Sequence, residues 1–327
     1  MGVGIITHVD VDGVCSAAIA KISYPEADVA FEEPFTLTER LKTLPRNWET
    51  VIVLDLGIDV VRKDEVKGIF RELSEARKVI YIDHHPLPPG VNRGVLRCHA
   101  FVHDTGVSTS ELALRYFKPP EALEHVALIG AIGDYQQNTP TMRRLMARQY
   151  WRTVYLETFL LEGALEVSRG DDYFRREVVE GLARGLWPSD IRDLLSRAYL
   201  GLSQEMMLKS YVKRNARKIA RNIALVSDVP FMATGKAASY VVQVTDAEVG
   251  IAAFLDRGFV RLSARRAKGS DLNLRELISK AAAKVGGLGG GHPAAAGGVV
   301  RAEKFNDFIR ALKGGRASSG IHLSHDR

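Results

Sequence analysis

The 327-residue chain has only two cysteines, Cys15 and Cys98, which lie far apart and outside any Cys-x-x-Cys pair. This spacing argues against a structural zinc site, and a chain of this length needs no disulfide for stability. Long apolar runs are also missing, so we expect no membrane-spanning segment. The first residues lack the basic, apolar and small-residue order of a secretion signal, which predicts a cytoplasmic protein.

Internal repeats are absent as well, and the composition is that of a soluble globular protein, with 46% hydrophobic and 26% charged residues. The length suffices for two ordinary domains, each with its own core. The net charge of +6 favours polyanionic partners, because neutralising phosphates gives affinity for nucleic acid of any sequence. A basic enzyme without such a partner would have the same balance, so charge alone leaves both interpretations open.

Apolar runs alternate with amphipathic segments over residues 1–140, and this alternation predicts the fold class. The expected strands and helices lie at 4–7, 14–22, 51–54, 62–76, 78–82, 106–116 and 122–132. The runs at 51–54 and 78–82 are continuously apolar, as in strands that are buried on both faces. Alternating strands and helices predict an α/β fold with a doubly wound parallel sheet.

The pattern then changes twice, which predicts the domain organisation. Helical periodicity dominates residues 141–221, and strand patterns return after residue 222. We therefore predict an α/β domain over 1–140, a helical connector over 141–221 and a smaller α/β domain over 222–313. The Gly/Ser-rich tail over 314–327 is expected to be disordered.

Several elements are expected in the later segments. Strands are predicted at 223–226, 240–244, 250–254 and 259–263, and a helix capped by Asp271 at 272–284, before a glycine run at 286–291. Lys213, Arg217 and Arg221 are spaced i, i+4 and i+8, which predicts a basic stripe on one helix. Such a stripe is either a solvated face or a track for a nucleic-acid backbone.

Acidic and imidazole side chains follow three of the expected strands. His8, Asp10 and Asp12 follow the first, Asp55 the second, and Asp83, His84 and His85 the third. In an extended backbone the alternation would turn the first three side chains to one side. All seven would lie at the carboxyl edge of the sheet, where doubly wound folds bind ligands.

Carboxylates gathered in a cleft repel one another, so something must compensate their charge. Two divalent cations would do so, and would also activate a water and bind phosphoryl oxygens. Oxygen and imidazole ligands favour manganese, then magnesium, and the lack of thiolates disfavours zinc. A single aspartate at a strand end is usually a turn former or a helix cap, but agreement between three strand ends favours a metal site.

These motifs resemble those of a known family. His8-Val9-Asp10-Val11-Asp12-Gly13, Asp55, Asp83-His84-His85 and Gly133-Asp134 resemble the four motifs of the DHH phosphoesterase family, in the correct order. Gly289-Gly290-Gly291-His292-Pro293 with Ala295-Ala296-Gly297 is similar to the DHH-associated C-terminal domain of its exonuclease and nanoRNase branches. The resemblance covers both ends of the chain and leaves out the helical middle.

The resemblance implies a role for each motif residue. Asp10 and Asp12 would bind separate metals, Asp55 would bridge both, and His84 and Asp134 would be further ligands. His85 would contact the scissile phosphate, and Asp83 would orient a histidine. His8 is also predicted as a ligand, although the first motif is not spaced identically in every branch.

The second domain is predicted to bind the substrate. The family pattern adds Arg261, Ser263 and Arg265 on a neighbouring strand, where their alternation would place them on one face on which arginine can bind phosphate. By resemblance, Gly289, Gly290, Gly291 and His292 would complete a clamp that presents a terminal phosphodiester to the metals. Without that resemblance, the glycine run would be a flexible loop and the arginines a solvated strand edge.

We therefore predict a manganese-dependent exonuclease that acts on single-stranded nucleic acid and leaves 5′-mononucleotides, resembling archaeal RecJ-like nucleases. One alternative is a nanoRNase or 3′-phosphoadenosine 5′-phosphate phosphatase that uses a short oligonucleotide or nucleotide. Another is a non-catalytic scaffold for a helicase or replisome protein, which the complete set of ligand positions disfavours. Polarity, DNA or RNA preference, and oligomeric state stay open.

Overall fold

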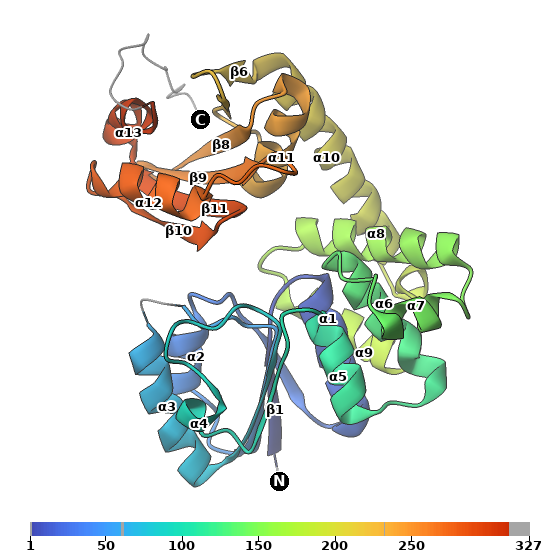
Figure 1. The fold of residues 1–327 in the computed structure, drawn as a ribbon. Helices are drawn as coiled ribbons and strands as arrows, with labels where there is room; N and C mark the ends of the chain where they lie inside the picture. Colours follow the sequence, from blue (N-terminus) through green and yellow to red (C-terminus); the bar gives the residue numbers. More distant parts are fainter. Residues whose placement is uncertain (1, 60–61, 232, 314–327) are drawn as a thin grey trace. The chain divides into compact units, whose positions relative to one another are not determined.

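The computed structural model describes residues 2–59, 62–231 and 233–313 (Figure 1). The chain divides between Leu202 and Ser203 into two compact units, each with its own sheet and apolar core. The predicted tail, 314–327, lies outside the described residues. Within the described part of the chain, no helix is long and apolar enough to cross a membrane.

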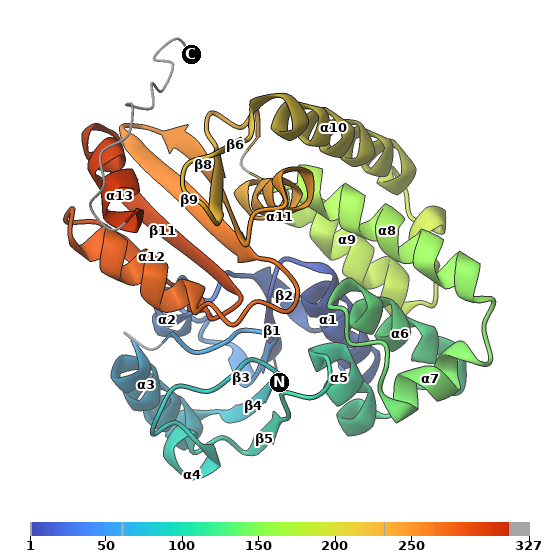
Figure 2. The same ribbon diagram turned by 45° about the horizontal axis from the view of Figure 1, so that its top comes forward.

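The first unit contains a five-stranded sheet in the order β2-β1-β3-β4-β5, in which all pairs are parallel. Its strands are β1 (Gly2–Thr7), β2 (Asp28–Phe31), β3 (Trp48–Leu54), β4 (Lys78–Asp83) and β5 (Ala100–His103). Figure 2 shows the five strands side by side. This confirms the predicted fold class, although β2 and β5, with four residues each, were not predicted. The strand order changes direction between β1 and β3, where such folds bind ligands.

Helices cover both faces of this sheet because alternate strand residues point to opposite sides. Ile5, Ile52 and Ile80 pack against α1 (Val11–Ser23), α5 (Thr109–Phe117) and α6 (Glu124–Gly133). The intervening residues of the same strands pack with α2 (Leu37–Lys42), α3 (Lys63–Ala76) and α4 (Arg93–Leu96) on the other face (Figure 1). The central strands therefore contain continuous apolar runs, at 51–54 in β3 and 79–82 in β4, and a buried aspartate directly follows each run.

Two glycines let α6 approach its neighbours closely. A Cβ at Gly133 would lie 2.6 Å from the Val11 side chain on α1, and one at Gly130 would lie 2.4 Å from the Ser110 hydroxyl on α5. These contacts fix the C-terminal end of α6, which is capped by Asp134.

The helical segment is divided between the two units. It contains α7 (Pro140–Met146), α8 (Trp151–Val167), α9 (Asp172–Ala183), a short 3-10 helix at Pro188–Asp190 and α10 (Leu194–Asn215). Helix α8 packs on α6, and α10 crosses it so closely that a Cβ at Gly201 would lie 2.2 Å from the Gly163 carbonyl. Helices α7 to α9 thus share the apolar core of the first unit.

The second unit has a six-stranded mixed sheet in the order β10-β11-β9-β8-β7-β6. Its elements are β6 (Arg217–Lys218), β7 (Ile223–Val226), α11 (Thr234–Thr245), β8 (Val249–Asp256), β9 (Phe259–Arg266), α12 (Leu274–Ala283), β10 (Leu288–His292), β11 (Ala295–Arg301), a 3-10 helix at Ala302–Lys304 and α13 (Phe305–Leu312). Only β7 and β8 pair in parallel.

Three local predictions for this unit are wrong. Residues 240–244 belong to helix α11, because burial of Ala237, Ala238 and Val241 on one helical face outweighs the β-propensity of the segment. The cap of α12 is Asn273, which accepts a hydrogen bond from the Glu276 amide, and not Asp271. The predicted basic stripe also fails, because α10 ends at Asn215 and the chain continues as a strand.

We predict that Gly133→Ala destabilises the first unit by about 1–3 kcal/mol, because the new methyl group overlaps Val11 at a packed helix crossing. Gly68→Ala is the matched control, since this helical glycine is exposed and a Cβ there meets nothing within 4 Å. Its replacement should stabilise the protein by about 0.5–1 kcal/mol. Urea unfolding measures both changes, and equal effects would refute the role of Gly133.

Candidate metal centre

The polar residues after β1 lie in a tight turn that leads into α1. Asp10 caps this helix and accepts a hydrogen bond from the Gly13 amide at 3.0 Å, while Asp12 is already in the first helical turn. A Cβ at Gly13 would lie 2.4 Å from the His8 carbonyl, so the turn requires glycine. The expected extended arrangement of His8, Asp10 and Asp12 is wrong, because capping by Asp10 starts the helix at once.

His8, Asp10 and Asp55 form a first group of possible metal ligands, with one donor atom from each within 4.8 Å of the others. His8 Nδ1 lies 2.8 Å from Asp10 Oδ2 and 3.7 Å from Asp55 Oδ2. The other ring nitrogen of His8 lies 3.2 Å from Glu33 Oε2. This contact fixes the orientation of the imidazole, as partners of metal-ligating histidines do.

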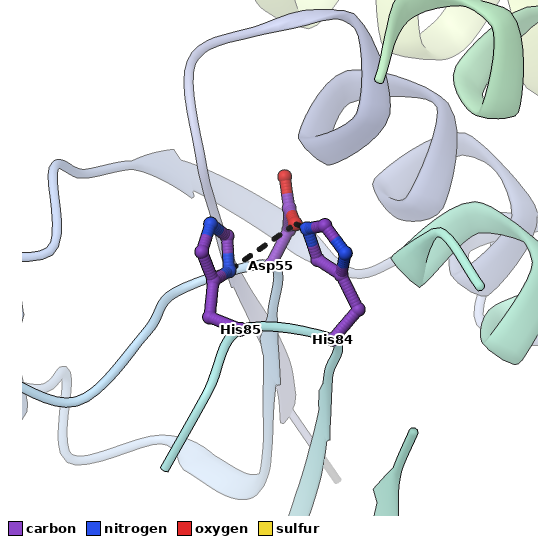
Figure 3. Close-up of side chains that lie close together, drawn as sticks. All are labelled: Asp55, His84 and His85. Carbon is purple, nitrogen blue, oxygen red and sulfur yellow. Dashed lines mark ion pairs between the residues drawn. The ribbon is translucent and has the colours of Figure 1, made fainter. Parts of the chain in front are cut away.

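Asp12, His84 and Asp134 form a second group with the same spacing limit, and Asp55, His84 and His85 form a third. His84 Nδ1 lies 3.5 Å from Asp134 Oδ2, and His84 Nε2 lies 3.5 Å from Asp55 Oδ1. Figure 3 shows both histidine rings directed toward Asp55. Asp55 and His84 each belong to two groups, so the structure brings all the predicted ligands together in one cluster.

Asp55 is the central residue of the cluster. Its side chain is 1% exposed, and its backbone has a φ of 57°, which is uncommon for a residue other than glycine. A strained residue of this kind at a strand end is frequent at functional sites. The Thr109 hydroxyl donates a hydrogen bond to Asp55 Oδ1 at 2.8 Å and holds this carboxylate in place.

Burial and mutual repulsion raise the pKa values of three carboxylates in this cluster, whereas the charge and hydrogen bond of His8 outweigh burial and lower the pKa of Asp10. The pKa of Asp12 is raised to about 6, mainly by burial and also by the charge of Asp10. The pKa of Asp134 is raised to about 7 by burial and by Asp12 and Asp10, and that of Asp55 is raised well above its usual range by burial and the same two neighbours. The cationic side chains near the cluster therefore do not compensate its negative charge. Bound divalent cations would compensate it.

The pKa values of the adjacent His84 and His85 are shifted in opposite directions. Burial and the neighbouring His85 lower the pKa of His84 to about 4, so its imidazole is neutral and able to bind a metal at neutral pH. Burial also opposes charge on His85, but the hydrogen bond and charge of Asp83 outweigh it and raise the pKa of His85 to about 9. His85 is 39% exposed and is therefore a cation that an anionic substrate can reach.

Asp83 belongs to none of the three ligand groups and contacts His85 and Tyr81. Asp83 Oδ1 lies 2.8 Å from His85 Nδ1, and Asp83 Oδ2 accepts a hydrogen bond from the Tyr81 hydroxyl at 2.9 Å. The carboxylate is fully buried. These contacts support the predicted role of Asp83 in orienting a histidine, which remains a prediction.

Sequence reasoning missed Glu33, Thr109 and Ser110. The backbone amides of Thr109 and Ser110, in the first turn of α5, donate hydrogen bonds of 2.8 and 2.9 Å to the two oxygens of Asp12. A helix N-terminus stabilises an anion in this way. The sequence Ser108-Thr109-Ser110-Glu111 has the pattern of a helix start, and Glu33 closely follows the unpredicted strand β2, so both signals were present.

The predicted substrate residues lie in the second unit. Strand register places Ser263 opposite Gly297 and Gly290, and Arg265 opposite Ala295 and His292, so these residues share one sheet face. The Ser263 hydroxyl lies 2.8 Å from that of Thr234 at the start of α11. Arg261 lies on the same face but binds Asp256 through Nε at 2.9 Å.

The three glycines of β10 differ in their surroundings. A Cβ at Gly289 would lie 3.0 Å from the backbone of α12, and one at Gly291, where φ is 122°, would lie 2.6 Å from the Ala295 carbonyl. A Cβ at Gly290 would meet nothing within 4 Å. Gly289 and Gly291 are thus required by packing, whereas Gly290, two strands from Ser263, leaves the shared face open at its own position.

Comparison with known families supports this organisation. Residues 2–143 match the DHH family, N-terminal domain, and residues 219–314 match the DHHA1 domain. No curated protein sequence matches the chain.

Several solved structures share the fold. The pGpG-specific phosphodiesterase PggH from Vibrio cholerae is 16% identical, with a TM-score of 0.60 over 95% of this chain and 98% of that one. An exonuclease RecJ bound to manganese is 17% identical, with a TM-score of 0.63 over 96% of this chain and 89% of that one. CDC45 from Entamoeba histolytica is 12% identical, with a TM-score of 0.54 over 96% and 95% of the two chains. At sequence identities this low, the structural similarity establishes a shared fold but not a shared activity.

We predict that Thr109→Val weakens manganese binding about 10-fold or more, because loss of the hydroxyl frees Asp55 to rotate away from its neighbours. Thr109→Ser keeps the hydroxyl and the amide contacts, and should bind within about 3-fold of the wild type. Isothermal titration with Mn²⁺ measures both, and identical affinities for the two variants would contradict this role.

The raised pKa values also predict a pH dependence of stability. Asp12 and Asp134, at about 6 and about 7, bind protons more tightly in the folded metal-free protein than in the unfolded chain. The stability they contribute is complete below about pH 4 and is lost as the pH rises through about 6 to 7. Because a divalent cation bound by these carboxylates would replace the protons, the rise in Tm on adding Mn²⁺ should grow from about pH 5 to about pH 8. Differential scanning calorimetry with Mn²⁺ or EDTA measures this, and a shift independent of pH would contradict it.

Proposed function

Because the chain belongs to the DHH phosphoesterase family, with a DHH N-terminal domain followed by a DHHA1 domain, we propose that it is a manganese-dependent exonuclease acting on single-stranded nucleic acid. The products would be 5′-mononucleotides. The observation that carries the proposal is the cluster of overlapping ligand groups that share Asp55 and His84. Burial and mutual repulsion raise the pKa values of Asp12, Asp55 and Asp134, and the cluster lies at the carboxyl edge of a parallel sheet.

The ligand groups accommodate two divalent cations. His8 and Asp10 would bind one, Asp12, His84 and Asp134 the other, and Asp55 would bridge them. Oxygen and imidazole donors suit manganese, and the manganese in the related RecJ structure supports this choice. The cations would supply Lewis acidity and an activated water for hydrolysis of a phosphodiester.

The protein's own side chains position the phosphate. His85 is cationic, partly exposed and adjacent to His84, with ring centroids 4.4 Å apart, so it can donate a hydrogen bond to a phosphoryl oxygen. Asp83 keeps this imidazole protonated and oriented. In the transition state the fixed positive charge would stabilise the charge that develops on the phosphate.

Three features support a nucleic-acid substrate. The net charge of +6 attracts a polyanion. In the second unit, Ser263, Arg265, Gly290 and His292 share a face with room for a phosphate beside the open Gly290. The structurally similar RecJ is an exonuclease.

The tests of this function use Asp55→Asn and His85→Ala. Asp55→Asn should abolish metal-dependent hydrolysis of an end-labelled oligonucleotide and weaken Mn²⁺ binding, because it removes the shared ligand. His85→Ala should lower kcat by about 10²–10³-fold and leave Mn²⁺ affinity unchanged, since it removes a phosphate contact only. Asp64→Asn, an exposed aspartate paired with Lys67 on α3, is the matched control. Wild-type activity of Asp55→Asn would refute the site.

The same assay over a series of oligonucleotide lengths separates the alternatives. The structurally similar PggH, 98% of whose chain the match covers, is a phosphodiesterase specific for pGpG. This favours a nanoRNase-like enzyme with a short substrate as the second candidate. Activity that falls beyond a few nucleotides would support that candidate. A scaffold related in fold to CDC45 is the non-enzymatic alternative, and metal-dependent hydrolysis would argue against it.

A further inference from the structure

Helix α8 carries three aromatic side chains in a row, Trp151, Tyr155 and Phe159, which we call the aromatic ladder. They are spaced four residues apart and therefore lie on one helix face. The ring centroids of Trp151 and Tyr155 are 6.2 Å apart, and so are those of Tyr155 and Phe159. Tyr155 packs partly against the core, whereas Trp151 is 59% and Phe159 56% exposed.

The sequence that leads to the ladder is rich in arginine. Residues 135–156 contain Arg143, Arg144, Arg148 and Arg152 and no aspartate or glutamate. Arg148 pairs with Glu121, but the other three arginines make no ion pair within the described parts of the chain. The next acidic residue, Glu157, is buried and accepts hydrogen bonds from the Ser189 amide and hydroxyl. The segment that precedes the exposed rings in the sequence therefore adds positive charge, whereas Glu162 and Glu166 follow the rings on α8.

This combination identifies the class of partner. Exposed rings next to arginines match single-stranded nucleic acid, whose bases stack on aromatic faces and whose phosphates bind guanidinium groups. A second copy of the chain fits poorly, because a two-fold interface would place the same arginine-rich patch against itself. The 6.2 Å ring spacing exceeds the roughly 3.4 Å per nucleotide of a stacked strand, so the bound strand would be extended.

The arginine-rich segment begins at the metal centre. It follows Asp134 directly, and its first residue, Tyr135, is 79% exposed. Helices α7 and α8 both pack on α6, whose C-terminal end carries Asp134 (Figure 2). The segment therefore connects a predicted metal ligand with the ladder inside the first unit.

We propose that the aromatic ladder of α8, with Arg143, Arg144 and Arg152, binds single-stranded nucleic acid away from the scissile phosphate. This proposal rests on the proposed function, which it extends from the cleaved end to the body of the substrate. The ladder would stack bases without regard to sequence, and the arginines would contact phosphates. This surface would favour long strands over nucleotides or dinucleotides.

Trp151 reports directly on this contact. The full-length protein in EDTA, which prevents hydrolysis, is titrated with oligothymidylate or oligouridylate while tryptophan fluorescence is recorded. Stacking on Trp151 should quench the emission, because the other two tryptophans, Trp48 and Trp187, are buried or partly buried. The quench should vanish in Trp151→Phe. A quench of equal size in this variant would overturn the proposal.

Binding of a labelled strand, followed by fluorescence anisotropy, tests the ladder and the arginines separately. Trp151→Ala and Phe159→Ala should each raise Kd about tenfold, as expected when one stacked base is lost. Tyr173→Ala, an aromatic 67% exposed on α9, should leave Kd unchanged. Arg144→Gln and Arg152→Gln should each reduce the salt slope of log Kd by about 0.7, whereas Arg71→Gln on α3 should not.

The two proposals fail separately in this design. Metal-dependent hydrolysis of bis(p-nitrophenyl) phosphate by the wild-type protein tests the metal centre alone. If the wild-type protein hydrolyses this compound and Trp151→Ala and Phe159→Ala bind the strand with wild-type affinity, the ladder proposal is wrong. The proposed enzymatic activity would then still be supported. If these variants instead change the molecular mass measured by light scattering and leave strand affinity unchanged, the face joins two copies and the ladder proposal is wrong.

Discussion

Repulsion between buried carboxylates at the carboxyl edge of the parallel sheet is the constraint on which the rest of the first unit depends. Asp12, Asp55 and Asp134 lie close together, and burial together with their neighbours' charge raises the pKa of each. Such a cluster costs folding free energy unless protons or cations compensate it. The surrounding structure holds the carboxylates together despite this cost, and all three lie within the residues that match the DHH family, N-terminal domain. The repulsion among these carboxylates is therefore consistent with a site that binds divalent cations.

The supporting contacts come from backbone geometry as much as from side chains. Gly13 allows the turn that makes Asp10 a helix cap, and Gly133 lets α6 approach α1 so that Asp134 reaches the cluster. The first turn of α5 supplies two amides to Asp12 and the Thr109 hydroxyl to Asp55. Apart from the local turn at Asp10, these contacts join residues from different parts of the chain, which explains why a site with repelling charges can keep one geometry.

The proposed metal-binding and substrate-binding residues lie in different parts of the chain. The first unit carries the ligands and, on α8, exposed rings beside arginines. The second carries a small-residue sheet face bordered by Arg265, where packing requires Gly289 and Gly291 and leaves Gly290 open. A helical insertion that completes the core of the first unit on one side and presents aromatic rings on the other can serve both stability and binding. The helices have one face in the core and one face exposed because their sequences are amphipathic.

The sequence by itself determined the fold class of the first unit and the identity of the clustered residues, because buried parallel strands are continuously apolar and their first polar residues mark one edge. It failed where burial overrode local preference, as in α11, and where one capping side chain converted an expected strand into a helix, as at Asp10. Only the tertiary structure decided how the ligands are grouped, because Asp12, His84 and Asp134 come from three separate elements. It also distinguished the adjacent histidines: Asp83 holds His85 protonated, while burial keeps His84 neutral. Such differences depend on distances across the fold, which residue spacing along the chain does not specify.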